Sequence, residues 1–381
     1  MPASLGQARS EDHDQNLERR SATGEGWRHL KPLVSIQYLR AAAALAVVVY
    51  HASQWGVGVI DIGRAGVDLF FVISGVIMWK VTGVREGSPG AFVWRRLTRV
   101  APFYWLVTLV LTGVALVWPD FLDNVHPAVG HVLLSLAFIP HFDPKGLPFP
   151  LYAPGWSLNY EAFFYLLFAA VLFAPRRRQA ALVCAGLFLT VAAGFILNDP
   201  VYQLGANPML FQFAAGVAIA NLSEINGLPG RRGGWLLVAA GVAALAVPAA
   251  LGVFSEFWRP FLWGAPAALI VAGAMAIEGD GGVPQIPALA ALGEASYALY
   301  LTHEPAEAVI GHTLGTGNVW LFYPLAIAAS VAAGLACHRC VEGPLTAWTR
   351  TLVFRPAGDY ADGKTAPDRS PPSPSRAGRA W

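Results

Sequence analysis

Residues 39–56 read LRAAAALAVVVYHASQWG, an apolar run that carries Arg40 near one end and His51 near the other. On an α-helix, eleven residues turn through about 1100°, within roughly 20° of three full turns, so both side chains lie on one face. Ionisable groups inside membrane helices are costly and usually face a polar interior. We therefore expect one stripe of this helix to face a polar lumen. The alternative is an arginine that extends to the lipid surface beside an interfacial histidine.

The composition indicates a protein with many membrane crossings. Of the 381 residues, 55% are hydrophobic and 13% are charged, and the mean hydropathy is +0.48. Soluble domains usually contain about a quarter charged residues. The three cysteines, Cys184, Cys337 and Cys340, are too few for a disulfide framework. The sequence therefore predicts an all-α integral membrane protein.

A spanning helix needs roughly 20 apolar residues. Ten segments suit this length, at about 33–53, 65–81, 101–118, 156–174, 179–197, 207–221, 234–253, 258–276, 290–310 and 318–340. The segment 131–140 is too short to cross and is predicted to be a re-entrant or interfacial half-helix. We expect a bundle of about ten transmembrane helices with a polar central cavity.

Two polar tails are predicted to flank the membrane domain of residues 31–350. Residues 1–30 and 351–381 lack apolar periodicity and are expected to be disordered and cytoplasmic. The opening stretch lacks the basic patch and short apolar core of a cleaved signal peptide, so the first apolar helix is expected to direct membrane insertion.

Basic residues gather in loops that ten crossings place on one side. They are Arg28, Lys31, Lys80, Arg85, Arg95, Arg96, Arg99, Arg176, Arg177, Arg178, Arg231, Arg232, Arg339 and Arg350. Cytoplasmic loops are enriched in Lys and Arg. Both termini are therefore expected in the cytoplasm, with the protein in the plasma (inner) membrane. The sequence has no evident repeat, which argues against common transporter architectures.

Acidic and basic side chains recur in the outer half of several predicted helices. By the ten-crossing topology, Asp68, Glu161 and His303 lie at a depth similar to that of His51. Ser157 and Glu161 share one helical stripe, and so do the residues Ser296, Tyr300, His303 and Glu307. This arrangement predicts a shared polar chamber with acid–base chemistry. The alternative is hydrogen bonding that only holds the helices together.

A second cluster, Arg95, Arg96 and Arg99, opens the third predicted span. Guanidinium groups suit bidentate binding of phosphate, although plain anchoring of the membrane topology explains the cluster too. We expect no metal site. The Cys337–Cys340 pair has no redox fold around it, and the histidines His126, His131 and His141 have irregular spacing.

Several short motifs resemble those of the acyltransferase-3 family, in its exopolysaccharide O-acetyltransferase branch. Arg40 with His51 matches the family's basic-x10-His motif, and GVDLFFVISG, RRLTR, WSLNYE, SYALYLTH and VEGP follow in family order between about residues 34 and 346. One departure is Ala162, where many relatives carry a second acidic residue. Some relatives also carry a secreted esterase-like domain. Since a short polar tail follows the apolar region here, we expect the membrane domain or another protein to complete the transfer.

The resemblance implies transfer of an acyl group, usually acetyl, from cytoplasmic acyl-CoA to a hydroxyl of a glycan or lipid-linked sugar. His51 is the expected general base, and Glu161 or Asp68 is expected to orient it. Tyr300, His303 or Trp156 would donate to the oxyanion. The predicted binding residues are Arg40, Arg96 and Arg99 for the donor and Trp156, Ser157 and Tyr297 for the substrate. A covalent route through Ser74, Ser157 or His51 stays open.

Other classes of function remain as alternatives. A proton-coupled transporter or glycan exporter would also place charge within a helix bundle, and a scaffold of a polysaccharide assembly complex would leave the polar chamber unexplained. The partners expected are the acceptor, acyl-CoA, membrane lipid and polysaccharide assembly machinery, with no nucleic acid. The acyl chain, the sugar and the oligomeric state stay open.

Overall fold

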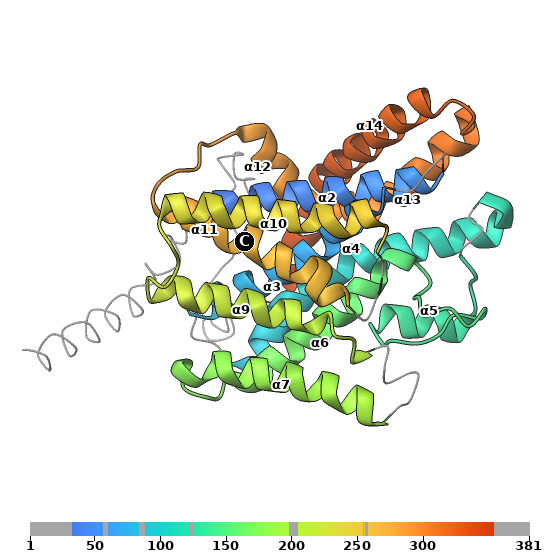
Figure 1. Ribbon diagram of the computed structural model, residues 1–381. Coiled ribbons are helices and arrows are strands. Elements are labelled where there is room, and N and C mark those ends of the chain that lie inside the picture. The colour runs from blue at the N-terminus through green and yellow to red at the C-terminus, as the bar shows by residue number, and fades with distance from the viewer. Residues whose placement is uncertain are drawn as a thin grey trace, which may run out of the picture.

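The computed structural model is a bundle of helices (Figure 1). It describes residues 33–55, 60–83, 88–121, 125–197, 205–253, 255 and 258–353. Over these ranges the structure contains helices and turns but no strand, as expected for an all-α membrane protein. The tail predicted for residues 1–30, and nearly all of the tail predicted for 351–381, lie outside the described residues.

The helices follow one another along the chain with short connections. Their bounds are α2 (Val34–Gln54), α3 (Ala65–Thr82), α4 (Pro89–Val117), α5 (Val129–Leu136), α6 (Trp156–Val171), α7 (Arg176–Leu197), α9 (Leu210–Glu224), α10 (Arg231–Leu251), α11 (Ala265–Gly279), α12 (Pro287–Glu294), α13 (Ser296–Leu314), α14 (Val319–Cys337) and α15 (Gly343–Val353). Shorter helical turns are η2 (Asp61–Arg64), η3 (Pro119–Phe121), η4 (Ala153–Gly155), η5 (Pro260–Gly264) and η6 (His338–Glu342).

All ten predicted spans fall on helices, but only seven described helical segments are long and apolar enough to cross a bilayer. Two of the others, α6 and α9, have 16 and 15 residues. At 1.5 Å per residue they rise about 24 Å, less than the roughly 30 Å of a hydrocarbon core. The third, α13, carries buried polar side chains that lower its hydropathy. The half-helix predicted at 131–140 is the eight-residue α5.

Helix α4 begins at Pro89, well before the predicted start at residue 101, and contains 29 residues. Ser88 caps it, because the serine Oγ accepts from the Ala91 amide at 3.3 Å. Pro102 lies inside the helix and leaves the carbonyl four residues earlier without its usual donor. The hydroxyl of Thr349, from α15, donates to that carbonyl of Thr98 at 3.3 Å.

One end of the bundle, which we call the basic end, gathers several helix termini through charged contacts. The Glu278 carboxylate of α11 accepts from the amides of Val34 and Ser35 at 2.7 and 3.0 Å and so caps α2. Arg176, at the start of α7, donates to the carbonyl of Trp79 in α3 at 2.8 Å. The first turn of α2 therefore lies beside the last turn of α11, and the first turn of α7 lies beside the last turn of α3.

Helix α3 is central, and its crossing with α9 depends on glycine. A Cβ at Gly75 would lie 2.3 Å from the Phe213 carbonyl oxygen, and one at Gly216 would lie 2.0 Å from the Val72 carbonyl oxygen. Close backbone approach at small residues is typical of membrane helix pairs. Most of the α3 span is buried, whereas α7, α10 and α14 are largely exposed apolar helices at the periphery (Figure 1).

Candidate active site

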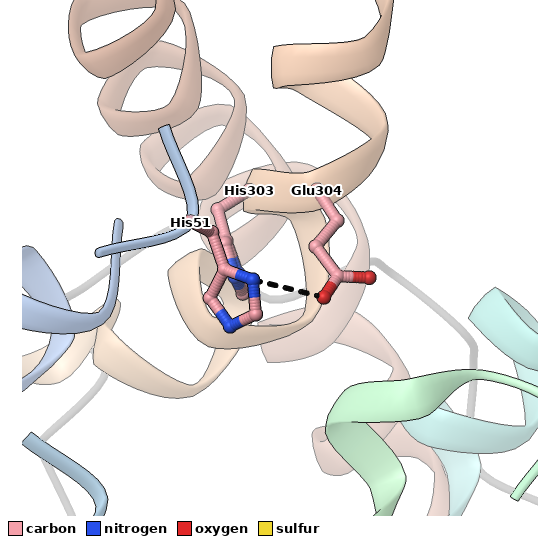
Figure 2. A group of neighbouring side chains, drawn as sticks. All are labelled: His51, His303 and Glu304. Carbon is pink, nitrogen blue, oxygen red and sulfur yellow. Dashed lines mark ion pairs between the residues drawn. The ribbon is translucent and has the colours of Figure 1, made fainter. Parts of the chain in front are cut away.

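His51, in the last turn of α2, lies beside two consecutive residues of α13. Its Nδ1 is 3.3 Å from Glu304 Oε1, and its ring centroid is 4.8 Å from that of His303. Figure 2 shows the other ring nitrogen of His51 pointing away from the carboxylate. In the neutral tautomer that carries its proton on Nδ1, next to this carboxylate, Nε2 of His51 carries the lone pair. This is the geometry of a histidine base oriented by an acid.

His303 is fully buried behind this pair. Its Nδ1 lies 2.8 Å from the carbonyl oxygen of Tyr300, which can only accept, so Nδ1 carries the proton. Its Nε2 is buried without a hydrogen-bond partner. The ring therefore places an acceptor nitrogen next to the His51 ring.

A proline shapes α13 at the site. Pro305 interrupts the helix and cannot donate to the carbonyl of Leu301, four residues earlier. The Tyr152 hydroxyl donates to that carbonyl instead, at 3.0 Å. The carbonyl that Pro305 leaves free thus lets Tyr152 join the segment before α6 to α13, close to Glu304 in the chain.

Three cavities surround these residues. The arginine cavity, of about 100 Å³, is lined by Arg40, Arg96, Arg99, Glu161 and Tyr300, among others. The histidine cavity, of about 660 Å³, is lined by His51, Trp156, Arg259, Tyr300 and Glu304, among others. The distal cavity, of about 650 Å³, is lined by His51, Trp55, Phe121, Glu304 and Glu307, among others.

The cavities meet at two places. Tyr300 lines both the arginine cavity and the histidine cavity, and its hydroxyl lies 2.9 Å from Ser157 Oγ and donates to the Pro154 carbonyl at 3.0 Å. His51 and Glu304 line both the histidine cavity and the distal cavity. Tyr300 therefore forms part of the wall between the cavity of the three arginines and the cavity of His51.

Asp68, predicted to orient His51, has other partners. Its fully buried carboxylate accepts from the Arg259 guanidinium at 3.0 Å and from the Gln212 amide at 2.5 Å. These contacts join α3 to α9 and to the segment before η5. The carboxylate beside His51 is that of Glu304, because α13 rather than α3 packs its polar face on the last turn of α2.

Glu161 also lies away from His51, in the arginine cavity. Its Oε1 accepts from Ser74 at 3.0 Å and from the hydroxyl of Tyr165. Tyr297 lines the same cavity and donates to the Val100 carbonyl at 2.7 Å. The structure thus divides most of the predicted site residues between two cavities instead of one chamber, and Asp68 and His303 line neither cavity.

The predicted donor-binding arginines do come together. Arg40 of α2 and Arg96 of α4 are buried, and both line the arginine cavity with Arg99. Trp156 and Ser157, predicted to contact the substrate, line the histidine and arginine cavities respectively.

Sequence reasoning overlooked two residues of this region, Glu304 and Arg259. Glu304 directly follows the predicted His303, but consecutive residues point about 100° apart on a helix. Glu304 therefore does not belong to the helical stripe that contains His303. Arg259 lies in a short polar interruption between two apolar runs, which resembles an ordinary loop cation. Glu304 could have been found from the sequence, because it is an acidic residue next to a histidine that was predicted to lie inside the membrane.

His51, His303 and Glu304 could also hold a metal ion by spacing. Each offers one ligand atom, and these atoms lie within 4.8 Å of one another. Two histidines and a carboxylate are a known catalytic zinc set. An ion bound there would occupy lone pairs that a general base needs, so the two chemistries compete at this cluster.

A fourth pocket, of about 930 Å³, lies between α4 and α6. Its walls are mostly apolar side chains such as Leu97, Phe163 and Leu166, and the predicted site residues do not line it. We therefore place the chemistry in the three polar cavities.

Comparison with known proteins identifies the class. The sequence profile of the acyltransferase domain family matches residues 33–339, most of the chain. The protein belongs to this acyltransferase family, as its motifs predict, and it is a multi-pass membrane enzyme of that class.

Two curated proteins are similar to this chain. The exopolysaccharide production protein ExoZ of Rhizobium meliloti is 34% identical over 306 residues, which cover 78% of this chain and 94% of ExoZ. The peptidoglycan O-acetyltransferase OatA of Listeria monocytogenes is 26% identical over 357 residues, and the match covers 83% of this chain but only 56% of OatA. No solved structure matches the chain significantly.

Proposed function

We propose that this enzyme transfers an acetyl group from cytoplasmic acetyl-CoA to a hydroxyl of a polysaccharide or of its lipid-linked precursor. The observation that carries the proposal is the His51–Glu304 pair in a cavity that joins the arginine cavity at Tyr300. The similarity to an exopolysaccharide production protein and to a peptidoglycan O-acetyltransferase supports the same reaction class.

We place the protein in the plasma membrane with its basic end facing the cytoplasm. The donor therefore enters from the basic end. Arg40, Arg96 and Arg99 bind its phosphates, because guanidinium groups form strong charge-assisted hydrogen bonds with phosphate oxygens. The arginine cavity encloses only about 100 Å³, so the thioester arm passes only when Tyr300 and Ser157 turn aside.

His51 acts as the general base. Its Nε2 takes the proton of the acceptor hydroxyl while the hydroxyl oxygen attacks the thioester carbonyl carbon. The carbon–sulfur bond then breaks, and the imidazolium returns the proton to the leaving thiolate. Glu304 holds the ring through Nδ1 and stabilises its charged form. Tyr300 turns its hydroxyl hydrogen from the Pro154 carbonyl to the thioester carbonyl oxygen as negative charge develops there.

Asp68 and Glu161 have structural roles in this scheme. Asp68 fixes Arg259 at the wall of the histidine cavity, and Glu161 holds Ser74 and Tyr165 in the arginine cavity. A direct transfer needs no covalent intermediate, because a thioester is already an activated acyl donor.

Labelled acetyl-CoA tests the proposal and separates it from transport. Membranes that contain the protein are supplied with acetyl-labelled acetyl-CoA, and label is followed into polysaccharide. We expect incorporation that depends on the protein and on His51. Movement of protons or glycan without any acetyl incorporation would establish a transporter instead.

A further inference from the structure

We propose that the distal cavity is the binding site for the acceptor sugar, with Glu307 and Trp55 as its recognition residues. The inference rests on the proposed function and adds to it the place from which the acceptor reaches His51. The donor and the acceptor then approach the base from two different cavities that meet at His51 and Glu304.

The position of the cavity supports this assignment. The donor route runs from the arginine cavity through Tyr300 into the histidine cavity. The distal cavity touches neither Tyr300 nor the three arginines, yet it shares His51 and Glu304 with the histidine cavity. A ligand in it could place a hydroxyl at His51 without displacing the donor. Direct transfer requires this, because both substrates must be bound together.

Glu307 supplies the polar recognition. It lies three residues after Glu304 on α13, lines the distal cavity and is fully buried. Neither of its carboxyl oxygens has a hydrogen-bond partner. A buried carboxyl without partners is unfavourable and is uncommon in proteins. The vicinal hydroxyls of a sugar would supply the missing donors.

Aromatic rings supply the apolar part of the site. The Trp55 ring occupies the space left by Gly311, where a Cβ would come within 2.8 Å of the ring. Trp55 and Phe121 each contact the ring of His312, with centroid distances of 6.1 and 4.9 Å. Rigid aromatic faces beside a few polar groups are well suited to the C–H faces and hydroxyl edges of a sugar.

The test uses membranes of the organism that makes this protein, with its own copy removed and replaced by variants. Acetyl-labelled acetyl-CoA is the probe, and three quantities are measured: label in polysaccharide, acetyl-CoA binding, and acetyl-CoA hydrolysis by water. For Glu307→Gln we expect at least about tenfold less label in polysaccharide, because lost hydrogen bonds to a buried carboxyl weaken binding by that order. For Trp55→Phe we expect a loss in the same direction, because the smaller ring offers the sugar less aromatic surface. Donor binding and hydrolysis should stay at the wild-type level.

Trp320→Ala is the matched control, since Trp320 is 89% exposed and does not line the four described cavities. It should label polysaccharide like the wild type. Full labelling by Glu307→Gln, or a parallel loss of donor binding, would overturn the acceptor site alone. No labelling by the wild-type protein would overturn the proposed function and this inference together.

Discussion

Glu304 Oε1 lies 3.3 Å from His51 Nδ1, and this contact joins α13 to the last turn of α2. Both side chains are about one quarter exposed, at 28% and 26%, so they are accessible from the cavities that they line. Behind them His303 is fully buried. The pair thus lies in the wall that the histidine cavity and the distal cavity share. Glu304 contacts Nδ1 of His51, which leaves Nε2 for a substrate hydroxyl.

Replacing His51 with alanine should abolish transfer while the protein still inserts and folds. A general base contributes about 10²- to 10⁴-fold in rate, so labelling of polysaccharide should fall by that factor. The measurement is the initial rate of acetyl incorporation per molecule of inserted protein. Normal acetylation by a well-expressed His51→Ala variant would remove its catalytic role.

Glu304→Gln should lower kcat by about ten- to a hundredfold, because a hydrogen bond to a charged group contributes about 1.5–3 kcal/mol. The KM for acetyl-CoA should not change, since Glu304 does not line the arginine cavity. Glu224→Gln is the matched control, because Glu224 forms a partly exposed pair with Arg176 at the basic end. A rise in donor KM with unchanged kcat would contradict the orienting role.

Arg96→Ala and Arg99→Ala should each weaken acetyl-CoA binding by about ten- to a hundredfold, in line with the strength of charge-assisted hydrogen bonds. The weakening should shrink at high salt, because ions screen the attraction. Titration of acetyl-CoA into purified protein measures it, and Arg232→Ala, at an exposed position, serves as the control. If all variants bound acetyl-CoA equally, Arg96 and Arg99 would serve only to fix the membrane topology.

Asp68→Asn should destabilise the protein by about 3–5 kcal/mol, because it leaves Arg259 buried without its ionic partner. Denaturant unfolding of purified protein measures this loss. Arg259→Gln added to Asp68→Asn should recover part of the stability. Residual folded Asp68→Asn protein should keep activity per molecule close to that of the wild type, and a specific loss of turnover at full stability would instead give Asp68 a catalytic role.

Metal chelation should leave the activity unchanged, because the proposed reaction uses the lone pair of His51 directly. Added zinc should inhibit, since His51, His303 and Glu304 are spaced to bind it. His303→Ala should weaken the inhibition by zinc. Loss of activity in EDTA that zinc restores would replace the general base with a metal centre.

The fold could largely be predicted from the chain, because hydrophobic runs of membrane length admit few structures besides helices. Each predicted span falls on helices, although 290–310 is divided between α12 and α13, and the short segment at 131–140 overlaps the half-helix α5. The start of α4 was missed, since three arginines and a threonine interrupt the apolar pattern of its first twelve residues. Three of the ten spans are missing from the seven strongly apolar segments: α6 and α9 because they are short, and α13 because it carries polar side chains.

The candidate site was less predictable. Helical periodicity put Arg40 and His51 on one face, and the arginine cavity contains Arg40, Arg96 and Arg99 as expected. Periodicity does not reveal which helices are neighbours, so it paired His51 with Asp68 or Glu161. Those carboxylates contact Arg259 and Ser74 instead.

The sequence by itself determined the class of protein and the positions of the helices along the chain, because these follow from local hydrophobicity and from rise per residue. Only the tertiary structure decided that Glu304 is the acid beside His51, that Asp68 forms an ion pair with Arg259, and that separate cavities meet at Tyr300 and His51. The physical reason is that side-chain partners depend on helix packing, which glycine contacts and prolines set between segments far apart in the chain.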